Sequence, residues 1–336
     1  MARALITDAA GLALSADERA FFRDADPWGF IIFKRNVETP DQLRALTDSM
    51  RESVGRDAPI LVDQEGGRVQ RLGPPHWPKY PPGAAYGALY ERDTEAGLRA
   101  AWLGARLIAH DLRAVGIDVD CLPIADVPVS EADPVIGNRA YGMTPGQVAA
   151  IGQAVAEGLL AGGVLPVLKH IPGHGRATAD SHHALPVVST DATTLQSTDF
   201  AAFRPLAKLP LGMTAHVVFT AIDPVAPATT SGTMVRDVIR GHIGFDSLLM
   251  SDDISMNALA GTLAERARAT LAAGCDVVLH CNGAFDERRA VADACPPLAG
   301  DAKRRADAAL RLRRAPMPLD VAAARDEFAA MNAGVA

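Results

Sequence analysis

The chain has only four cysteines among its 336 residues, and no two of them form a CxxC pair. A structural zinc site built on cysteine needs such close pairs, so this spacing argues against one. Cys121 and Cys275 lie in apolar runs, which predicts that their thiols are buried. Histidine-based metal motifs are missing as well, because the sequence contains neither HxH nor HExxH. We therefore expect no metal ion and no other cofactor.

Long apolar runs and a surplus of positive charge are also missing. No apolar run approaches the roughly 20 residues that span a membrane, and Asp8 interrupts the place where a signal peptide would have its apolar region. These absences predict a cytoplasmic protein without a membrane partner. The formal net charge is -7, which argues against nucleic acid as the main partner. The one basic run, 303–314, has helical spacing and favours a solvated helix face over a binding patch.

What the sequence does contain is an alternation of short β-rich runs with longer helix-patterned stretches. The β-rich runs are apolar on both parities, as expected of strands that are covered on two faces. Eight β/α repeats in about 300 residues predict an α/β fold, a (β/α)8 TIM-type barrel. A doubly wound open sheet is the alternative, but no GxGxxG follows a β-rich run and no Walker A motif occurs. The eight runs are 4–7, 30–33, 60–63, 119–126, 166–170, 212–217, 248–252 and 277–282.

Helix start signals lie between these runs. Ser15, with a glutamate three residues later, has the pattern of a capping box. Thr39 and Thr144 each precede a proline, which predicts an N-cap followed by a proline at the first helical position. No Ser/Gly linker divides the chain. We therefore expect a single catalytic domain over residues 1–336, with a helical tail at about 317–336.

Polar residues gather where the predicted strands end. In a (β/α)8 barrel the active site lies at this rim, on the loops that follow the strands. Two of these residues, Asp252 and Asp253, are adjacent at the end of one run. Neighbouring residues of a strand point to opposite sides, so we expect only one of them to face the barrel axis and the other to cap or pair. The rim residues are Asp63, Arg139, Lys169, His170, His216, Asp252, Asp253 and Asn282.

The stretch KHIPGHGRATADSHHALP, residues 169–186, holds four of the nine histidines. Its proline and glycines cannot continue a strand or a helix, which predicts a long loop over the barrel mouth. Asp180 and His182 lie two apart, so the carboxylate can hydrogen-bond one ring nitrogen while the other stays free for proton transfer. The alternative to a proton-transfer role is that these residues belong to a solvated loop without a catalytic function. A shared metal ion would require His170, His174 and His182 to fold back toward one another.

These segments resemble the bacterial β-N-acetylhexosaminidases of glycoside hydrolase family 3, the single-domain enzymes of peptidoglycan recycling. The histidine segment KHxPGHG followed by DSH is the most specific part of the resemblance, and Ile171 stands where the family usually has phenylalanine. The matching segments occur in the family's order. They are DQEGGRVQR (63–71), VIGNRAYG (135–142), KHIPGHG (169–175), DSHHALP (180–186), AIDPVAPATTS (221–231) and SDDISM (251–256).

The resemblance implies a role for each matched residue. Asp252 would be the catalytic nucleophile, His182 the general acid/base and Asp180 its partner. His174 would shape the loop, and no role is implied for His183. The residues implied to hold an N-acetylglucosamine ring are Asp63, Arg71, Arg139, Lys169 and His170.

The function implied by the resemblance is that of a retaining exo-β-N-acetylglucosaminidase acting on cytoplasmic muropeptide fragments. Its partner would be a small molecule that contains N-acetylglucosamine, and we slightly favour a monomer. Three alternatives stay open: a phosphorolytic enzyme of the same family, a metal-dependent barrel hydrolase, and a sugar-binding module without catalysis.

Overall fold

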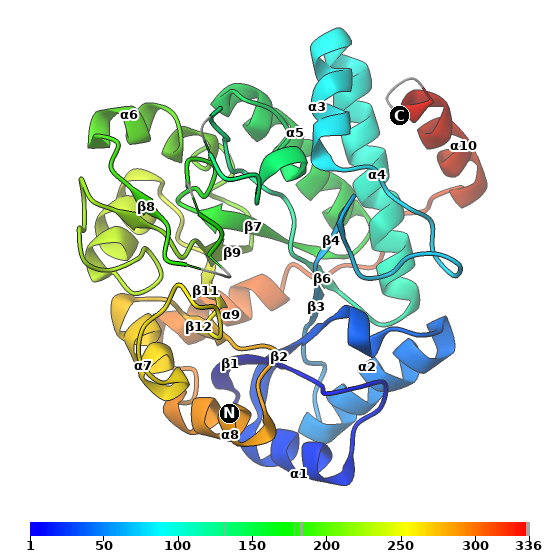
Figure 1. The fold of residues 1–336 in the computed structure, drawn as a ribbon. Coiled ribbons are helices and arrows are strands. Elements are labelled where there is room, and N and C mark those ends of the chain that lie inside the picture. The colour runs from blue at the N-terminus through cyan, green and yellow to red at the C-terminus, as the bar shows by residue number, and fades with distance from the viewer. Residues whose placement is uncertain (131, 178, 182–183, 334–336) are drawn as a thin grey trace.

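The computed structural model describes residues 1–130, 132–177, 179–181 and 184–333 (Figure 1). In this part of the chain, eight strands close into a barrel in the order β1-β12-β11-β9-β7-β6-β3-β2, and every neighbouring pair is parallel. The helices lie around this barrel (Figure 1). The predicted (β/α)8 architecture is therefore confirmed.

Each barrel strand falls on one of the predicted β-rich runs. The fourth run differs most, because its ladder ends at Asp120 and only Ile124 pairs again, with Lys169. Pro123 lies between them and has no N–H to donate to a ladder. The barrel strands are β1 (Arg3–Asp8), β2 (Pro27–Ile32), β3 (Ile60–Val62), β6 (Val119–Asp120), β7 (Leu165–Ile171), β9 (Leu211–Thr214), β11 (Leu248–Asp253) and β12 (Val277–Leu279).

The predicted helix caps are also present. Ser15 and Glu18 form a reciprocal capping box, and the side chains of Thr39 and Thr144 accept from backbone N–H groups of the helices that they precede. The basic run 303–314 begins in a helix. The α-helices are α1 (Ala16–Ala25), α2 (Pro40–Val54), α3 (Gly83–Arg92), α4 (Thr94–Ala114), α5 (Pro145–Ala161), α6 (Ala192–Ser197), α7 (Leu263–Ala273), α8 (Phe285–Ala294), α9 (Gly300–Leu310) and α10 (Val321–Asn332), and a π-helix covers Met234–His242.

The apolar core has two layers because each strand is covered on both faces. Ile31 and Leu61 belong to a cluster that fills the barrel interior, whereas Phe30 and Ile60 pack outward under the helices. This alternation accounts for runs that are apolar on both parities. All four cysteines are buried and free, as expected for Cys121 and Cys275.

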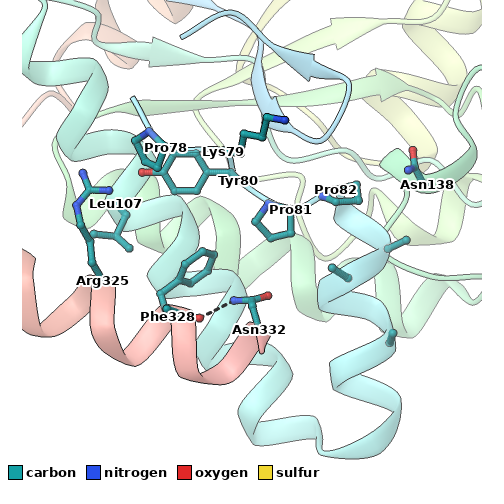
Figure 2. A pocket seen from close by; sticks show the side chains of 14 residues that line it. Pro78, Lys79, Tyr80, Pro81, Pro82, Leu107, Asn138, Arg325, Phe328 and Asn332 are labelled. Carbon is teal, nitrogen blue, oxygen red and sulfur yellow. Dashed lines mark hydrogen bonds between the residues drawn. The ribbon is translucent and has the colours of Figure 1, made fainter. Parts of the chain in front are cut away.

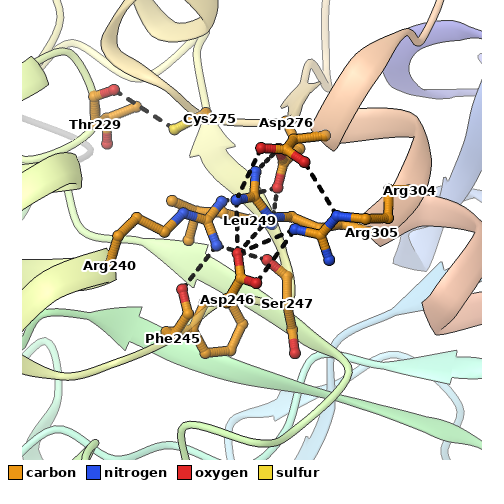
Figure 3. Close-up of polar contacts among 11 residues, drawn as sticks. Thr229, Arg240, Phe245, Asp246, Ser247, Leu249, Cys275, Asp276, Arg304 and Arg305 are labelled. Atoms are coloured by element: carbon orange, nitrogen blue, oxygen red, sulfur yellow. Dashed lines mark hydrogen bonds and ion pairs between the residues drawn. The ribbon is translucent and has the colours of Figure 1, made fainter.

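A buried ion cluster joins α9 to the barrel where β12 begins (Figure 3). Asp276 is almost fully buried, and its carboxylate binds Arg240 at 2.9 Å, Arg305 at 3.0 Å and the backbone N–H of Leu249 at 2.9 Å. Asp246 completes the cluster from the surface by accepting from Arg305 at 2.6 Å. Arg305 is therefore bound by one buried carboxylate, that of Asp276, and by one exposed carboxylate, that of Asp246.

We expect Asp276→Ala to destabilise the fold by about 3–5 kcal/mol, because it leaves largely buried arginine side chains without their carboxylate. Asp246→Ala is the matched control and should cost less than about 1 kcal/mol, since the side chain of Asp246 is 60% exposed. Urea unfolding of the two variants measures the difference. Equal losses would show that burial does not set the strength of this cluster.

The C-terminal helix α10 packs against α4, outside the barrel (Figure 1). Asp111 in α4 accepts from the Tyr80 hydroxyl at 2.7 Å and from Arg325 of α10 at 2.8 Å. A cavity of about 800 Å³ lies beside this contact, and Figure 2 shows the rings of Tyr80 and Phe328 at its edge. None of the predicted site residues lines this cavity.

Candidate active site

A smaller cavity, of about 300 Å³, lies at the carboxyl ends of the barrel strands. Its apolar lining includes Ile31, Met213 and Leu279, which come from β2, β9 and β12. The polar side chains come from the ends of β3, β7 and β11 and from the loops that follow β3, β6, β7 and β12. Seven of the eight predicted site residues line this cavity: Asp63, Arg71, Arg139, Lys169, His170, Asp180 and Asp252. The eighth, His182, lies outside the described residues, as does His183.

A short hairpin after β3 brings Arg71 back to the cavity. It pairs β4 (Gln64–Gly66) with β5 (Val69–Gln70) in antiparallel fashion. Gly66 has φ +92°, and a Cβ there would lie 2.3 Å from the backbone oxygen of Pro81. Only glycine combines that backbone conformation with so close an approach. The two glycines of DQEGGRVQR therefore make the turn that returns the arginine.

Three cations and two carboxylates form a continuous chain of ion pairs in the cavity. Lys169 Nζ lies 2.8 Å from Asp63 Oδ1 and 2.6 Å from Glu65 Oε1. Arg71 binds the other oxygen of Asp63 at 3.1 Å. Arg139 forms a bidentate pair with Glu65, at 2.8 and 2.7 Å. These groups hold one another in place and direct their remaining N–H and oxygen sites toward the cavity.

The same network keeps Asp63, Glu65, Arg139 and Lys169 ionised at neutral pH. Burial alone would raise the pKa of Asp63, but Lys169 and Arg71 outweigh it and hold this pKa well below its usual range. Burial likewise disfavours a charged lysine, yet Asp63 and Glu65 hold the pKa of Lys169 above its ordinary value. The cavity therefore offers fixed charges and fixed donors, which suit the hydroxyl groups of a neutral polar ligand.

We expect Lys169→Met to destabilise the protein by about 3–5 kcal/mol and to weaken ligand binding, because it leaves Asp63 and Glu65 buried with one cation fewer. Thermal unfolding and substrate KM measure the two effects. Lys208→Met is the control, because Lys208 is exposed and does not line the cavity. A variant of Lys169 that unfolds like the wild type would show that the network is not needed for stability.

Asp252 and Asp253 end β11 and differ in their hydrogen bonds. Asp253 accepts from Ser255 N at 2.9 Å, Ser255 Oγ at 2.6 Å and Cys281 N at 3.1 Å. Asp252 accepts through Oδ1 from Asp253 N at 2.8 Å, and Oδ2 has no hydrogen-bond partner in the described part of the chain. The expectation that one aspartate caps or pairs is confirmed for Asp253. Both aspartates line the cavity, and the expectation that only one of them faces the barrel axis stays a prediction.

The reason that both line the cavity lies in the strand. The register between β11 and β12 shifts between Met250 and Asp253, so strict alternation no longer holds at the strand end. Burial raises the pKa of Asp253 to about 6. Burial would also raise the pKa of Asp252, but His216 and His170 outweigh it and hold this pKa below its usual value. Asp252 therefore combines an ionised carboxylate with an oxygen that is free to react.

His216 is a satisfied core histidine and does not line the cavity. Its Nε2 lies 3.0 Å from the backbone oxygen of Asp253, and its Nδ1 lies 2.7 Å from Thr229 Oγ1. Because a carbonyl oxygen only accepts, Nε2 carries the proton. Burial lowers the pKa of His216. This residue therefore supports the end of β11 directly beside Asp252.

Asp126 holds the histidines of the KHIPGHG segment. Its carboxylate lies 2.7 Å from His170 Nδ1, and it accepts from the backbone N–H of His174 at 2.7 Å. The His174 ring then reaches Ser181 Oγ at 3.3 Å. Ser181 is the residue after Asp180, so the contact ties the loop to the barrel rim. The implied role of His174 in shaping the loop agrees with this geometry.

A second tie joins the loop to the segment after β11. The backbone oxygen of Ser181 accepts from Ala258 N at 3.2 Å. Asp180 faces the same cavity as Asp252, so the loop brings a carboxylate over the mouth from outside the barrel. Gly175 permits this path, because a Cβ there would lie 2.2 Å from the backbone oxygen of Val127.

Sequence reasoning missed two important residues, Glu65 and Asp126. Glu65 lies within the DQEGGRVQR segment, and Asp126 ends the fourth β-rich run, so both carried a positional signal. Their partners are distant in sequence: Glu65 and Arg139 are 74 positions apart, and Asp126 and His170 are 44 positions apart. Such pairings become visible only when the strands are placed side by side.

The expected absence of metal and of a membrane span stays a prediction. Among residues 1–130, 132–177, 179–181 and 184–333, no three histidine, cysteine or acidic side chains are grouped to hold a metal ion. No helix in that part of the chain is long and apolar enough to cross a bilayer.

The sequence is similar to a known protein family and to named relatives in it. The model of the family described as glycosyl hydrolase family 3 N terminal domain matches residues 8–313. A beta-hexosaminidase of Chromobacterium violaceum is 38% identical over 297 residues, which cover 87% of this chain and 82% of the relative. A beta-hexosaminidase of Methylococcus capsulatus is 41% identical over 279 residues, which cover 82% and 81% of the two chains.

A solved structure is similar over nearly its whole length. The crystal structure of NagZ from Neisseria gonorrhoeae in complex with N-trifluoroacetyl-D-glucosamine superimposes with a TM-score of 0.86 at 32% identity. The match covers 99% of this chain and 97% of that one.

Proposed function

Because the chain belongs to glycosyl hydrolase family 3, we propose that it is a retaining exo-β-N-acetylglucosaminidase of the β-N-acetylhexosaminidase class. Its proposed substrates are cytoplasmic muropeptide fragments in which N-acetylglucosamine is linked to anhydro-N-acetylmuramic acid. One observation carries the proposal. Asp252 presents a carboxylate oxygen without a hydrogen-bond partner in the described residues, in a cavity of about 300 Å³, with Asp180 on the loop across from it.

The cavity suits one terminal sugar. Its volume is at the lower end of the range for small-molecule sites. Asp63, Arg71, Arg139, Lys169 and His170 line it and offer N–H donors and carboxylate oxygens to ring hydroxyls and to an acetamido group. Because the contacts of this network are rigid, a sugar bound to them has its anomeric carbon held in a fixed position.

The reaction has two steps. In the first, Asp252 Oδ2 forms a bond to the anomeric carbon, the bond from that carbon to the leaving oxygen breaks, and protonated His182 gives its proton to that oxygen. In the second, neutral His182 takes a proton from water, the water oxygen bonds to the anomeric carbon, and Asp252 leaves. Asp180 stabilises the imidazolium and fixes the ring tautomer. A histidine thus replaces the second carboxylate of the usual retaining pair.

A parallel assay tests the proposed activity. We expect hydrolysis of 4-nitrophenyl β-N-acetylglucosaminide that survives EDTA, and little hydrolysis of the corresponding β-glucoside. Loss of activity with EDTA would favour a metal-dependent hydrolase, and no hydrolysis of either compound would favour a binding module. Release of sugar 1-phosphate only when phosphate is added would favour phosphorolysis.

Product stereochemistry tests the mechanism separately. With a double-displacement mechanism, the first N-acetylglucosamine released has the β configuration, before mutarotation mixes the anomers. Proton NMR during the first minutes of turnover distinguishes the two. Initial release of the α-anomer would refute the role of Asp252 as a nucleophile.

A further inference from the structure

The mouth of the active-site cavity is marked by two exposed residues. Of the described residues that line the cavity, only Arg68 and Asn282 are exposed, and the others are buried or partly buried. A cavity of about 300 Å³ encloses one sugar and leaves little room for more. A leaving group must therefore extend outward through the mouth, where these two side chains are the ones that solvent reaches most freely.

The hydrogen-bonding capacity of Asn282 is already committed. Its Oδ1 accepts from Arg35 at 2.6 Å, and its backbone N–H donates to Asp8 at 2.9 Å. Its amide nitrogen lies 3.5 Å from Asp253 Oδ2. Asn282 therefore shapes the mouth with little capacity left for a ligand.

Arg68 differs from every other described cation of the cavity. Lys169, Arg71 and Arg139 each bind a carboxylate. The Arg68 guanidinium instead donates through Nη2 to the backbone oxygens of Val135 and Pro134, the latter at 3.2 Å. No carboxylate in the described residues neutralises it. A guanidinium has five N–H groups, so most of its donors face solvent or a ligand.

The backbone around Arg68 is well held. The residue lies in the turn between β4 and β5, where the N–H of Gly67 donates to the oxygen of Tyr80 at 2.9 Å. The loop that accepts from Arg68 continues to Arg139, which is fixed by Glu65. The Arg68 side chain therefore extends from one well-held segment, the β4–β5 turn, and contacts a second, the loop that contains Val135.

We propose that Arg68 is a specificity-determining residue that binds a carboxylate on the leaving group. This inference rests on the proposed function and deepens it, because it favours aglycones whose muramic acid carboxylate is free over those in which an attached peptide has converted that carboxylate into an amide. Guanidinium and carboxylate form charge-assisted, often bidentate hydrogen bonds. At an exposed mouth the attraction is moderate and weakens with salt. The neutral end of the substrate is bound by the inner network and does not depend on Arg68.

Two matched substrates test the proposal. They are N-acetylglucosaminyl-β-1,4-anhydro-N-acetylmuramic acid and its methyl ester, which share one leaving oxygen and differ in one charge. We expect the wild type to prefer the free acid by about 10-fold in kcat/KM at low salt, which corresponds to one charge-assisted hydrogen bond. Arg68→Gln should remove the preference, Arg68→Lys should retain part of it, and added salt should reduce it in the wild type.

The controls separate specificity from structure. Lys79→Gln changes an exposed cation that lines the other, larger cavity, and it should keep the preference of the wild type. An Arg68→Gln variant that slows acid and ester equally would assign the residue a structural role and overturn the proposal, as would an unchanged preference. A wild type that hydrolyses neither disaccharide would refute the proposed function itself. A wild type that hydrolyses both without preference would refute only the role of Arg68.

Discussion

Asp252→Ala should lower kcat/KM by at least about 10⁴-fold, the scale on which loss of a nucleophile acts. The reason is visible in the site: Asp252 is held ionised beside His216 and His170, and its Oδ2 has no hydrogen-bond partner in the described residues. Steady-state kinetics with a nitrophenyl glycoside measure the loss. Added azide should restore part of the turnover and give a product of inverted configuration, because a small anion can then occupy the space of the carboxylate.

The adjacent aspartate provides the matched control. Asp253 accepts hydrogen bonds from Ser255 and Cys281 and closes the turn that follows β11. Asp253→Asn should therefore reduce thermal stability and slow turnover far less than Asp252→Ala does. If the two variants exchange these behaviours, the nucleophile is Asp253 and the assignment of Asp252 is wrong.

His182→Ala should slow turnover by roughly 10²- to 10⁴-fold, as expected for the loss of a general acid/base. The loss should depend on the leaving group. A nitrophenolate needs little protonation, so the first step with an aryl glycoside is affected least, whereas a sugar leaving group shows the full effect. A pH profile adds a second measurement, because the limb governed by the histidine should disappear.

The neighbouring histidine is the control for this variant. His183 lies in the same loop and has no implied role, so His183→Ala should keep both the rate and the pH profile. Normal turnover of a disaccharide by His182→Ala would exclude this residue as the proton carrier. Equal losses in the two variants would point to a general effect on the loop.

The barrel was predictable because its signals are local. Apolar runs such as 60–63 and 248–252, and caps such as Ser15 with Glu18, specify strands and helix starts over a few residues. The positions of Asp63 and Lys169 followed from a general rule, that strand ends of a barrel meet at one rim. Local pattern and topology together therefore placed most of the candidate site.

What could not be predicted depends on long-range contacts and local irregularity. The pairing of Glu65 with Lys169 joins residues from different strand ends, and neither sequence segment specifies it alone. The shift of register near Asp253 has no signature in SDD. The identity of His216 as a core residue required the positions of Thr229 and the Asp253 backbone.

The network of Asp63, Glu65, Arg71, Arg139 and Lys169 has a consequence for how the enzyme senses its surroundings. The pKa values of Asp63 and Lys169 are displaced away from neutrality in opposite directions. Under the proposed function, binding of the terminal sugar should therefore change little between mildly acidic and mildly basic media. Asp253 differs, because burial raises its pKa to about 6. The proposed sugar contacts and the end of the strand that carries Asp252 should therefore respond differently to acidity.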